Sequence, residues 1–110
     1  MSTASIVSVD EQGIRGRLSG LTSTSIAWQD ITWIGAFHRG EGKDAFACVW
    51  VRTPKEEFPV EFDARDAGWM ALLEGIAAHL ADARPYKKWF PPPHHPMLAI
   101  NMQNIYEKSA

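Results

Sequence analysis

The sequence predicts an α+β domain in which one amphipathic helix packs on a strongly bent antiparallel sheet of about six strands. Two observations support this fold class. Up to residue 62, short segments alternate apolar and polar residues, and this period of two is typical of half-buried strands. Beyond that point, apolar residues recur every three to four positions, which is the period of a helix buried on one side.

The first two strands are expected at residues 5–9 and 14–18. Between them, Asp10-Glu11-Gln12-Gly13 has the composition of a tight turn, and Gly13 could supply a positive φ. Alternation in the second segment places its two arginines on the face opposite Ile14. These features predict an opening hairpin with one apolar face.

The segment from Ile26 to His38 predicts a short strand, a corner and a longer strand. Asp30 stands at the corner, where its side chain can accept hydrogen bonds from backbone amides beyond it. In the longer strand, both faces are partly apolar, so we expect a central position in the sheet. Trp33 and Phe37 share one of these faces.

After a hairpin loop at residues 39–43, residues 44–53 form the most apolar predicted strand. The next strand is expected at residues 57–62, with Phe58, Val60 and Phe62 pointing inward and Glu57, Pro59 and Glu61 pointing outward. Pro59 cannot donate a ladder hydrogen bond, which favours an edge position for this strand.

A helix is predicted over residues 64–83, ended by Pro85. Its apolar stripe consists of Trp69, Leu72, Leu73, Ile76 and Leu80. Asp63 is a suitable N-cap. Gly75 is unfavourable in a helix interior, and we expect it where the helix closely approaches the sheet. The predicted core contains Trp28, Ile31, Phe46, Val49, Phe58, Val60, Phe62 and the five residues of the stripe.

The last quarter of the chain differs in composition. Residues 91–96 are proline-rich and must be extended, and Met97 to Tyr106 predicts a final strand. Residues 85–110 therefore form a proline-stiffened arm that ends in a strand, within a single domain over 1–110. The arm could close its own sheet or add to the edge of a second chain, and the sequence leaves both alternatives open.

Several segments resemble known proteins. The corner formed by Ile26, Trp28, Asp30, Ile31 and Ile34 resembles an element of pleckstrin-homology-like and GRAM-like domains. The corner running into residues 36–39, the helix with its leading Trp69, and a tail with Trp89, Pro92 and Asn101 resemble a family of small uncharacterised bacterial proteins. The resemblance implies the predicted meander and helix. Pleckstrin-homology-like domains that bind phosphoinositides carry a basic first hairpin. The first hairpin of this chain has an acidic turn at residues 10–13, so phosphoinositide binding is not expected.

Composition excludes several classes of function. The net charge of −2 disfavours a nucleic-acid binder. No apolar run approaches the ~20 residues of a membrane-spanning helix, so integral membrane association is not expected. A single cysteine and an N-terminus unlike a signal peptide favour the cytoplasm.

No catalytic, metal or cofactor site is predicted, and we expect no enzyme activity. His94 and His95 are adjacent on an extended segment, so their side chains diverge and do not suit one metal ion. Cys48 lies in the most apolar strand, which favours a buried structural thiol. The predicted interaction surface comprises Trp33, Phe37, Trp89, Phe90, His94, His95 and Tyr106.

The leading functional hypothesis is a non-enzymatic protein-interaction module. Its partner is an unknown protein or a second copy of the chain in a homodimer. A small-ligand or lipid-headgroup binding domain of the pleckstrin-homology-like kind is the first alternative. An immunity-type protein that neutralises a toxin is the second.

Overall fold

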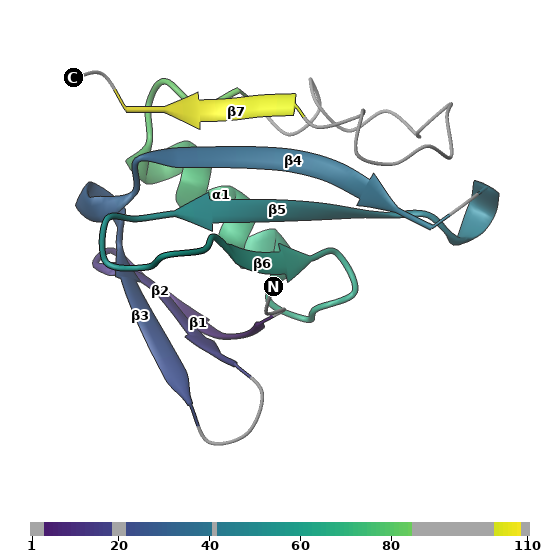
Figure 1. Ribbon diagram of the computed structural model, residues 1–110, viewed down its shortest axis with the longest axis horizontal. Coiled ribbons are helices and arrows are strands. Elements are labelled where there is room, and N and C mark those ends of the chain that lie inside the picture. Colours follow the sequence, from purple (N-terminus) through teal and green to yellow (C-terminus); the bar gives the residue numbers. More distant parts are fainter. Residues whose placement is uncertain (1–3, 19–21, 41, 85–102, 109–110) are drawn as a thin grey trace.

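The computed structural model describes residues 4–18, 22–40, 42–84 and 103–108. In these residues, seven strands form two antiparallel sheets, accompanied by one α-helix and two short 3₁₀ turns (Figure 1). The α+β class and the antiparallel pairing are confirmed, with seven strands where about six were predicted, but the prediction of one bent sheet is wrong because the strands form two separate sheets. The strands are β1 (Ser5–Val9), β2 (Gly13–Arg17), β3 (Ser23–Ala27), β4 (Trp33–Arg39), β5 (Phe46–Arg52), β6 (Val60–Asp63) and β7 (Gln103–Glu107), and the helix is α1 (Trp69–His79).

The chain changes sheet at the predicted corner. Strands β1, β2 and β3 form one sheet, and the other has the order β6-β5-β4-β7. Between them, Trp28–Asp30 form a 3₁₀ turn closed by the Ile31 amide donating to the Trp28 carbonyl at 3.2 Å. Trp28 is therefore part of the turn and not of the preceding strand. The Asp30 carboxylate lies 3.7 Å from Lys55 Nζ, which connects the corner to the loop after β5.

The opening turn forms as predicted, but Gly13 has a different role there. Asp10 Oδ1 accepts hydrogen bonds from the amides of Gln12 at 2.9 Å and Gly13 at 3.1 Å. Gly13 does not adopt a positive φ; in the described part of the chain, only Gly40 does, at 87°. Instead, a Cβ on Gly13 would lie 1.9 Å from the Ile26 carbonyl oxygen. The absence of a side chain allows β2 and β3 to pair at this point.

Strand β4 is central, as its two apolar faces predicted. Ile34 pairs with Val51 of β5 on one side and with Tyr106 of β7 on the other. Strand β6 is at an edge, as the proline before it indicated. Strand β7 shows that the described end of the arm closes the chain's own sheet. The predicted final strand also included residues 97–102, which lie outside the described residues.

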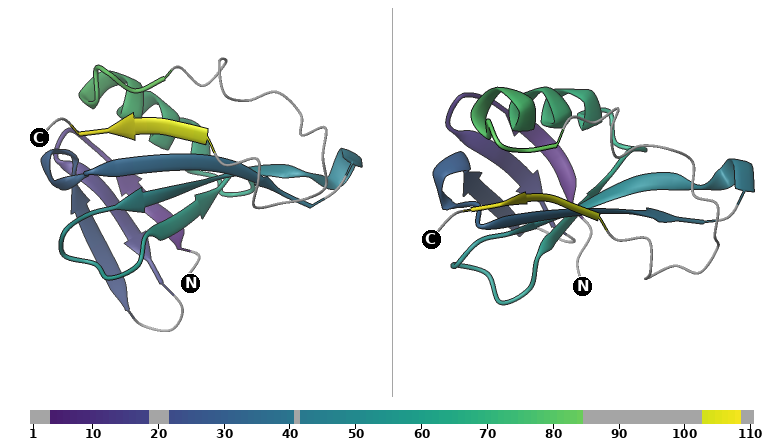
Figure 2. Two further views of the ribbon diagram at one scale, coloured as in Figure 1. Left: turned by 45° about the horizontal axis from the view of Figure 1, so that its top comes forward. Right: turned by 90° about the horizontal axis from the view of Figure 1, so that it is seen from above.

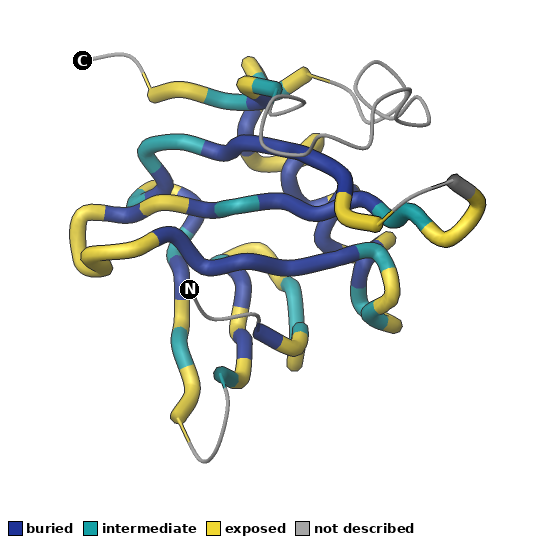
Figure 3. Tube along the Cα trace, turned by 45° about the vertical axis from the view of Figure 1, so that its right-hand side comes forward, coloured by how far each residue is buried: buried dark blue, intermediate teal, exposed yellow. Residues whose placement is uncertain are grey.

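The core lies on one face of the four-stranded sheet. In Figure 2, α1 and the three-stranded sheet lie on the same side of it. Buried residues run continuously from Ile34 to His38 in β4 and through β6, whereas in β5 the buried run is interrupted at Trp50 (Figure 3). Of the predicted core, Phe46 is only half-buried and Phe58 is 63% exposed. Phe58 precedes the first residue of β6, Val60, so strand alternation does not control its direction.

The helix is shorter than predicted at both ends, because residues 64–68 form turns and its last residue is His79. Its N-cap is Gly68 and not Asp63. The Asp66 carboxylate accepts hydrogen bonds from the amides of Gly68 and Ile6, each at 2.8 Å. One side chain therefore binds the backbone just before the helix and connects it to β1, which sequence periodicity could not reveal.

Gly75 confirms the predicted close approach of the helix. A Cβ at this position would lie 2.6 Å from Trp28 Cζ2 and 2.8 Å from Val9 Cγ1. The indole of Trp28 thus packs directly on the helix backbone. The cost of a helical glycine, about 1 kcal/mol relative to alanine, is offset by this contact between the corner and α1.

Candidate functional site

The four-stranded sheet has a second face, which we call the outer face. Ile34, Val49 and Phe62 belong to the core, so their strand neighbours point the other way. Strand register aligns Trp33 with Arg52, and Phe37 with Cys48. The outer face comprises Trp33, Phe37 and Arg39 of β4; Phe46, Cys48, Trp50 and Arg52 of β5; Glu61 and Asp63 of β6; and Arg65, which extends back over Phe46.

Arginine side chains lie over aromatic rings across the outer face. The guanidinium carbon of Arg65 is 4.0 Å from the ring centroid of Phe46. Arg39 lies 5.0 Å from the ring centroid of Phe37, and Arg52 lies 5.8 Å from that of Trp33. These separations are within the range of cation–π attraction. The outer face therefore carries three guanidinium groups, each placed over an aromatic ring.

A buried carboxylate orients one of these arginines. Glu61 is 2% exposed and accepts hydrogen bonds from Arg39 Nε at 2.9 Å, Arg39 Nη2 at 2.7 Å and Trp50 Nε1 at 2.9 Å. Alternation correctly predicted that Glu61 points away from the core. Although it points outward from an edge strand, Glu61 is buried because Arg39 and Trp50 enclose it. The two-pronged contact fixes the plane of the guanidinium.

Burial by itself raises the pKa of Glu61. The hydrogen bonds from Arg39 and Trp50, together with the positive charge of Arg39, outweigh this effect of burial, so the pKa of Glu61 is lowered. The pKa of Asp63 is also lowered, chiefly by its hydrogen bond from Arg65, with Nη2 of Arg65 3.1 Å from Oδ2. Both carboxylates are therefore ionised at neutral pH, and each holds one of the outer-face arginines.

Cys48 lies beneath these charges and is fully buried, as predicted. Burial raises the pKa of its thiol to about 12, and the negative charge of Glu61 adds to this effect. The thiol is protonated at neutral pH, which does not favour nucleophilic chemistry.

The structure separates the residues of the predicted interaction surface. Trp33 and Phe37 share the outer face, although Phe37 is only 8% exposed. Tyr106 pairs with Ile34 and packs against the core on the opposite side. Trp89, Phe90, His94 and His95 lie outside the described residues. The predicted interaction surface did not include Arg39, Arg52 or Glu61. For the two arginines, the available signal was an aromatic residue two positions earlier in the same strand, which places both side chains on one face. Glu61 lies on β6 and carried no such signal.

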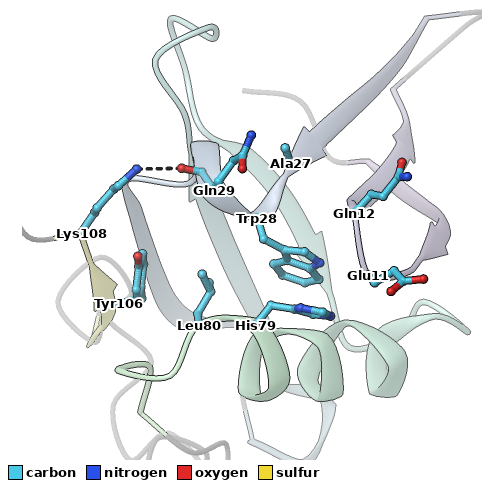
Figure 4. Close-up of a pocket in the computed structure, with 9 residues that line it drawn as sticks. All are labelled: Glu11, Gln12, Ala27, Trp28, Gln29, His79, Leu80, Tyr106 and Lys108. Carbon is cyan, nitrogen blue, oxygen red and sulfur yellow. Dashed lines mark hydrogen bonds between the residues drawn. The ribbon is translucent and has the colours of Figure 1, made fainter.

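Tyr106 borders a cavity of about 640 Å³ at the end of the helix (Figure 4). Its wall includes Trp28, whose ring stacks on His79 with centroids 5.0 Å apart and planes 17° apart. The Trp28 indole also donates to the Asp10 carbonyl at 2.8 Å. At the rim, Lys108 Nζ donates to the Gln29 carbonyl at 2.7 Å. This cavity is separate from the outer face and combines aromatic walls with charged ends.

No group of three or more His, Cys, Asp or Glu side chains suited to a metal ion occurs among the described residues. Within the same residues, no helix has the length and apolar character needed to cross a membrane. Comparisons of the chain with protein-family models, curated proteins and solved structures found no match in any of the three. The resemblance to pleckstrin-homology-like domains stays a prediction.

Proposed function

We propose that the chain is a non-enzymatic protein-binding module that contacts its partner through the outer face. The observation that carries this proposal is the set of three arginine–aromatic pairs spread over one side of the four-stranded sheet. Tryptophan and arginine are enriched among the residues that dominate binding energy in protein interfaces. A side chain already held in place also loses less conformational entropy when a partner binds.

Charge distribution favours an acidic partner. The side chains of Arg39 and Arg65 are 48% and 66% exposed, whereas those of Glu61 and Asp63 are 3% and 8% exposed. Cations therefore face outward while the anions that hold them lie beneath. A partner surface that combines carboxylates with apolar groups would match both the guanidinium groups and the partly exposed indole of Trp33.

Reversing the charge of Arg52 tests the surface, because this side chain is exposed and its contact with Trp33 is modest. In affinity capture with quantitative mass spectrometry, Arg52→Glu should reduce recovery of the principal partner by about tenfold or more. Arg17→Glu is the matched control, since Arg17 is an exposed arginine on β2 of the other sheet. Both variants should keep the wild-type melting temperature to within a few degrees.

Equal recovery with Arg52→Glu and Arg17→Glu would exclude the outer face as the binding surface. Loss of recovery with both variants would point to a general charge effect and would also count against the proposal. Trp33→Ala provides an independent check, since it removes the aromatic half of the same pair without changing the charge.

A second copy of the chain is the second candidate partner, favoured by the loop between β5 and β6. This loop exposes Phe58 next to Glu56 and Glu57, so it offers an acidic and aromatic segment complementary to the outer face. Light scattering at high concentration should then give about twice the chain mass of 12.3 kDa, and Phe58→Ser or Arg52→Glu should return it to the monomer mass. A wild-type monomer at every concentration would rule this candidate out.

Two further functions remain proposals. An immunity-type protein would use the outer face to cover a toxin's site, which is a special case of protein binding. A lipid-headgroup binder has less support, because the first turn carries Asp10 and Glu11. A cytoplasmic location is also proposed, supported by the single free cysteine, Cys48, because disulfides are rare in a reducing compartment.

A further inference from the structure

We infer that the cavity beside Trp28 binds a small aromatic carboxylate carrying a hydrogen-bond donor at its far end. This site lies away from the outer face, so it adds a small-molecule ligand to the proposed protein binding. The cavity volume of about 640 Å³ falls within the range of roughly 300–1,000 Å³ that small-molecule sites occupy.

The aromatic wall of the cavity is rigidly held. The indole of Trp28 donates to the Asp10 carbonyl, stacks on His79 and packs against Gly75, which leaves no room beneath it. Tyr106 is held by the pairing of β7 with β4. A wall that is already in position loses little entropy when a ligand binds.

The middle of the cavity suits a flat apolar ring. Figure 4 shows Trp28 and Tyr106 on either side of Leu80, which forms the apolar floor between them. Aromatic rings pack favourably in offset or edge-to-face arrangements. Trp28 is 6% exposed and Tyr106 is partly exposed, so a six-membered ring over Leu80 would contact the small exposed part of the indole and the side chain of Tyr106.

The two ends of the cavity carry opposite charges. Lys108 stands at one end, and Glu11 lies with Gln12 at the opposite end (Figure 4). Lys108 uses one of its three donors on the Gln29 carbonyl, which leaves two for a carboxylate. The Glu11 carboxylate can accept a hydrogen bond from an amino group of the ligand. A ligand complementary to this cavity carries an anionic group at one end, an aromatic ring in the middle and a hydrogen-bond donor at the other end.

4-Aminobenzoate has this arrangement and serves as the probe. We expect its titration into ¹⁵N-labelled protein to shift the indole N–H signal of Trp28. Benzamide, which has a similar ring but no charge, should bind at least about tenfold more weakly, because it forms no charge-assisted contact with Lys108. Lys108→Met should weaken 4-aminobenzoate binding by about tenfold or more, and Tyr106→Leu should also weaken it.

Lys43→Met is the matched control, since Lys43 is an exposed lysine in the β4–β5 connection and does not line the cavity. It should bind 4-aminobenzoate like the wild type. The inference is overturned if the Trp28 indole signal stays fixed up to about 10 mM probe, a concentration that would reveal even millimolar affinity. It is also overturned if benzamide binds as well as 4-aminobenzoate, or if Lys108→Met and Lys43→Met behave alike.

Discussion

Replacing Arg39 with methionine should lower the free energy of unfolding by about 3 kcal/mol at neutral pH, because it leaves a buried carboxylate without its cation. Glu61 would keep its hydrogen bond from Trp50 Nε1 but lose both bonds from Arg39. Urea unfolding followed by circular dichroism measures the loss. Arg17→Met, at an exposed position on β2, is the control and should stay within about 0.5 kcal/mol of the wild type.

The loss of stability caused by Arg39→Met should depend on pH in a defined direction. In the wild type, the folded-state pKa of Glu61 is lowered, so the stabilisation is present above the ordinary carboxyl value of 4.5 and is lost as pH falls through the folded-state pKa. In the Arg39→Met variant, burial without the cation should raise the pKa of Glu61, so protonation relieves the buried charge. The stability difference between the two proteins should therefore narrow towards about pH 4. A small or pH-independent difference would show that Arg39 does not compensate the Glu61 charge.

Gly13→Ala should destabilise the fold by about 3 kcal/mol, at the upper end of the usual cost of overpacking. The added Cβ would lie 1.9 Å from the Ile26 carbonyl oxygen and 2.9 Å from Ala27 Cα, so β2 and β3 must separate. The obstacle is backbone of a paired strand and cannot move by a side-chain rotation. Thermal and urea unfolding should both report the loss.

Gly16→Ala is the matched comparison on the same strand. Its Cβ would meet Phe62 Cε1 at 3.2 Å and the Ser5 carbonyl oxygen at 3.3 Å, which small shifts can relieve. We expect a cost of about 1 kcal/mol for this variant. If Gly13→Ala were no more destabilising than Gly16→Ala, the close approach of β2 and β3 at Gly13 would be incorrect.

Local pattern predicted the direction of side chains well. Alternation placed Trp33 and Phe37 on one face of β4, and helical periodicity identified Leu72 and Ile76 as buried. Gly75, as an unfavourable residue in a good helix, correctly indicated close packing. These inferences succeed because side-chain direction follows from the backbone geometry of a single strand or helix.

Element boundaries and sheet membership were less predictable. The helix begins at Trp69, where Asp66 accepts hydrogen bonds from Gly68 and from Ile6, which lies 60 positions away from Asp66. The corner at Trp28–Asp30 divides the strands between two sheets, because β4 pairs with β5 and β7 and not with β3. Both outcomes depend on hydrogen bonds between segments that are far apart in the sequence. A pattern read over a short stretch of residues cannot reveal such bonds.

The sequence by itself determined that Glu61 faces away from the core and that Cys48 lies in an apolar strand. Only the tertiary structure decided that Glu61 is buried, because Arg39 comes from a different strand to cover it. The cavity also required the tertiary structure, since its lining comes from the first hairpin, the corner, the helix and β7. Alternation fixes which way a side chain points, whereas a polar group's burial and charge depend on the partners that folding brings to it.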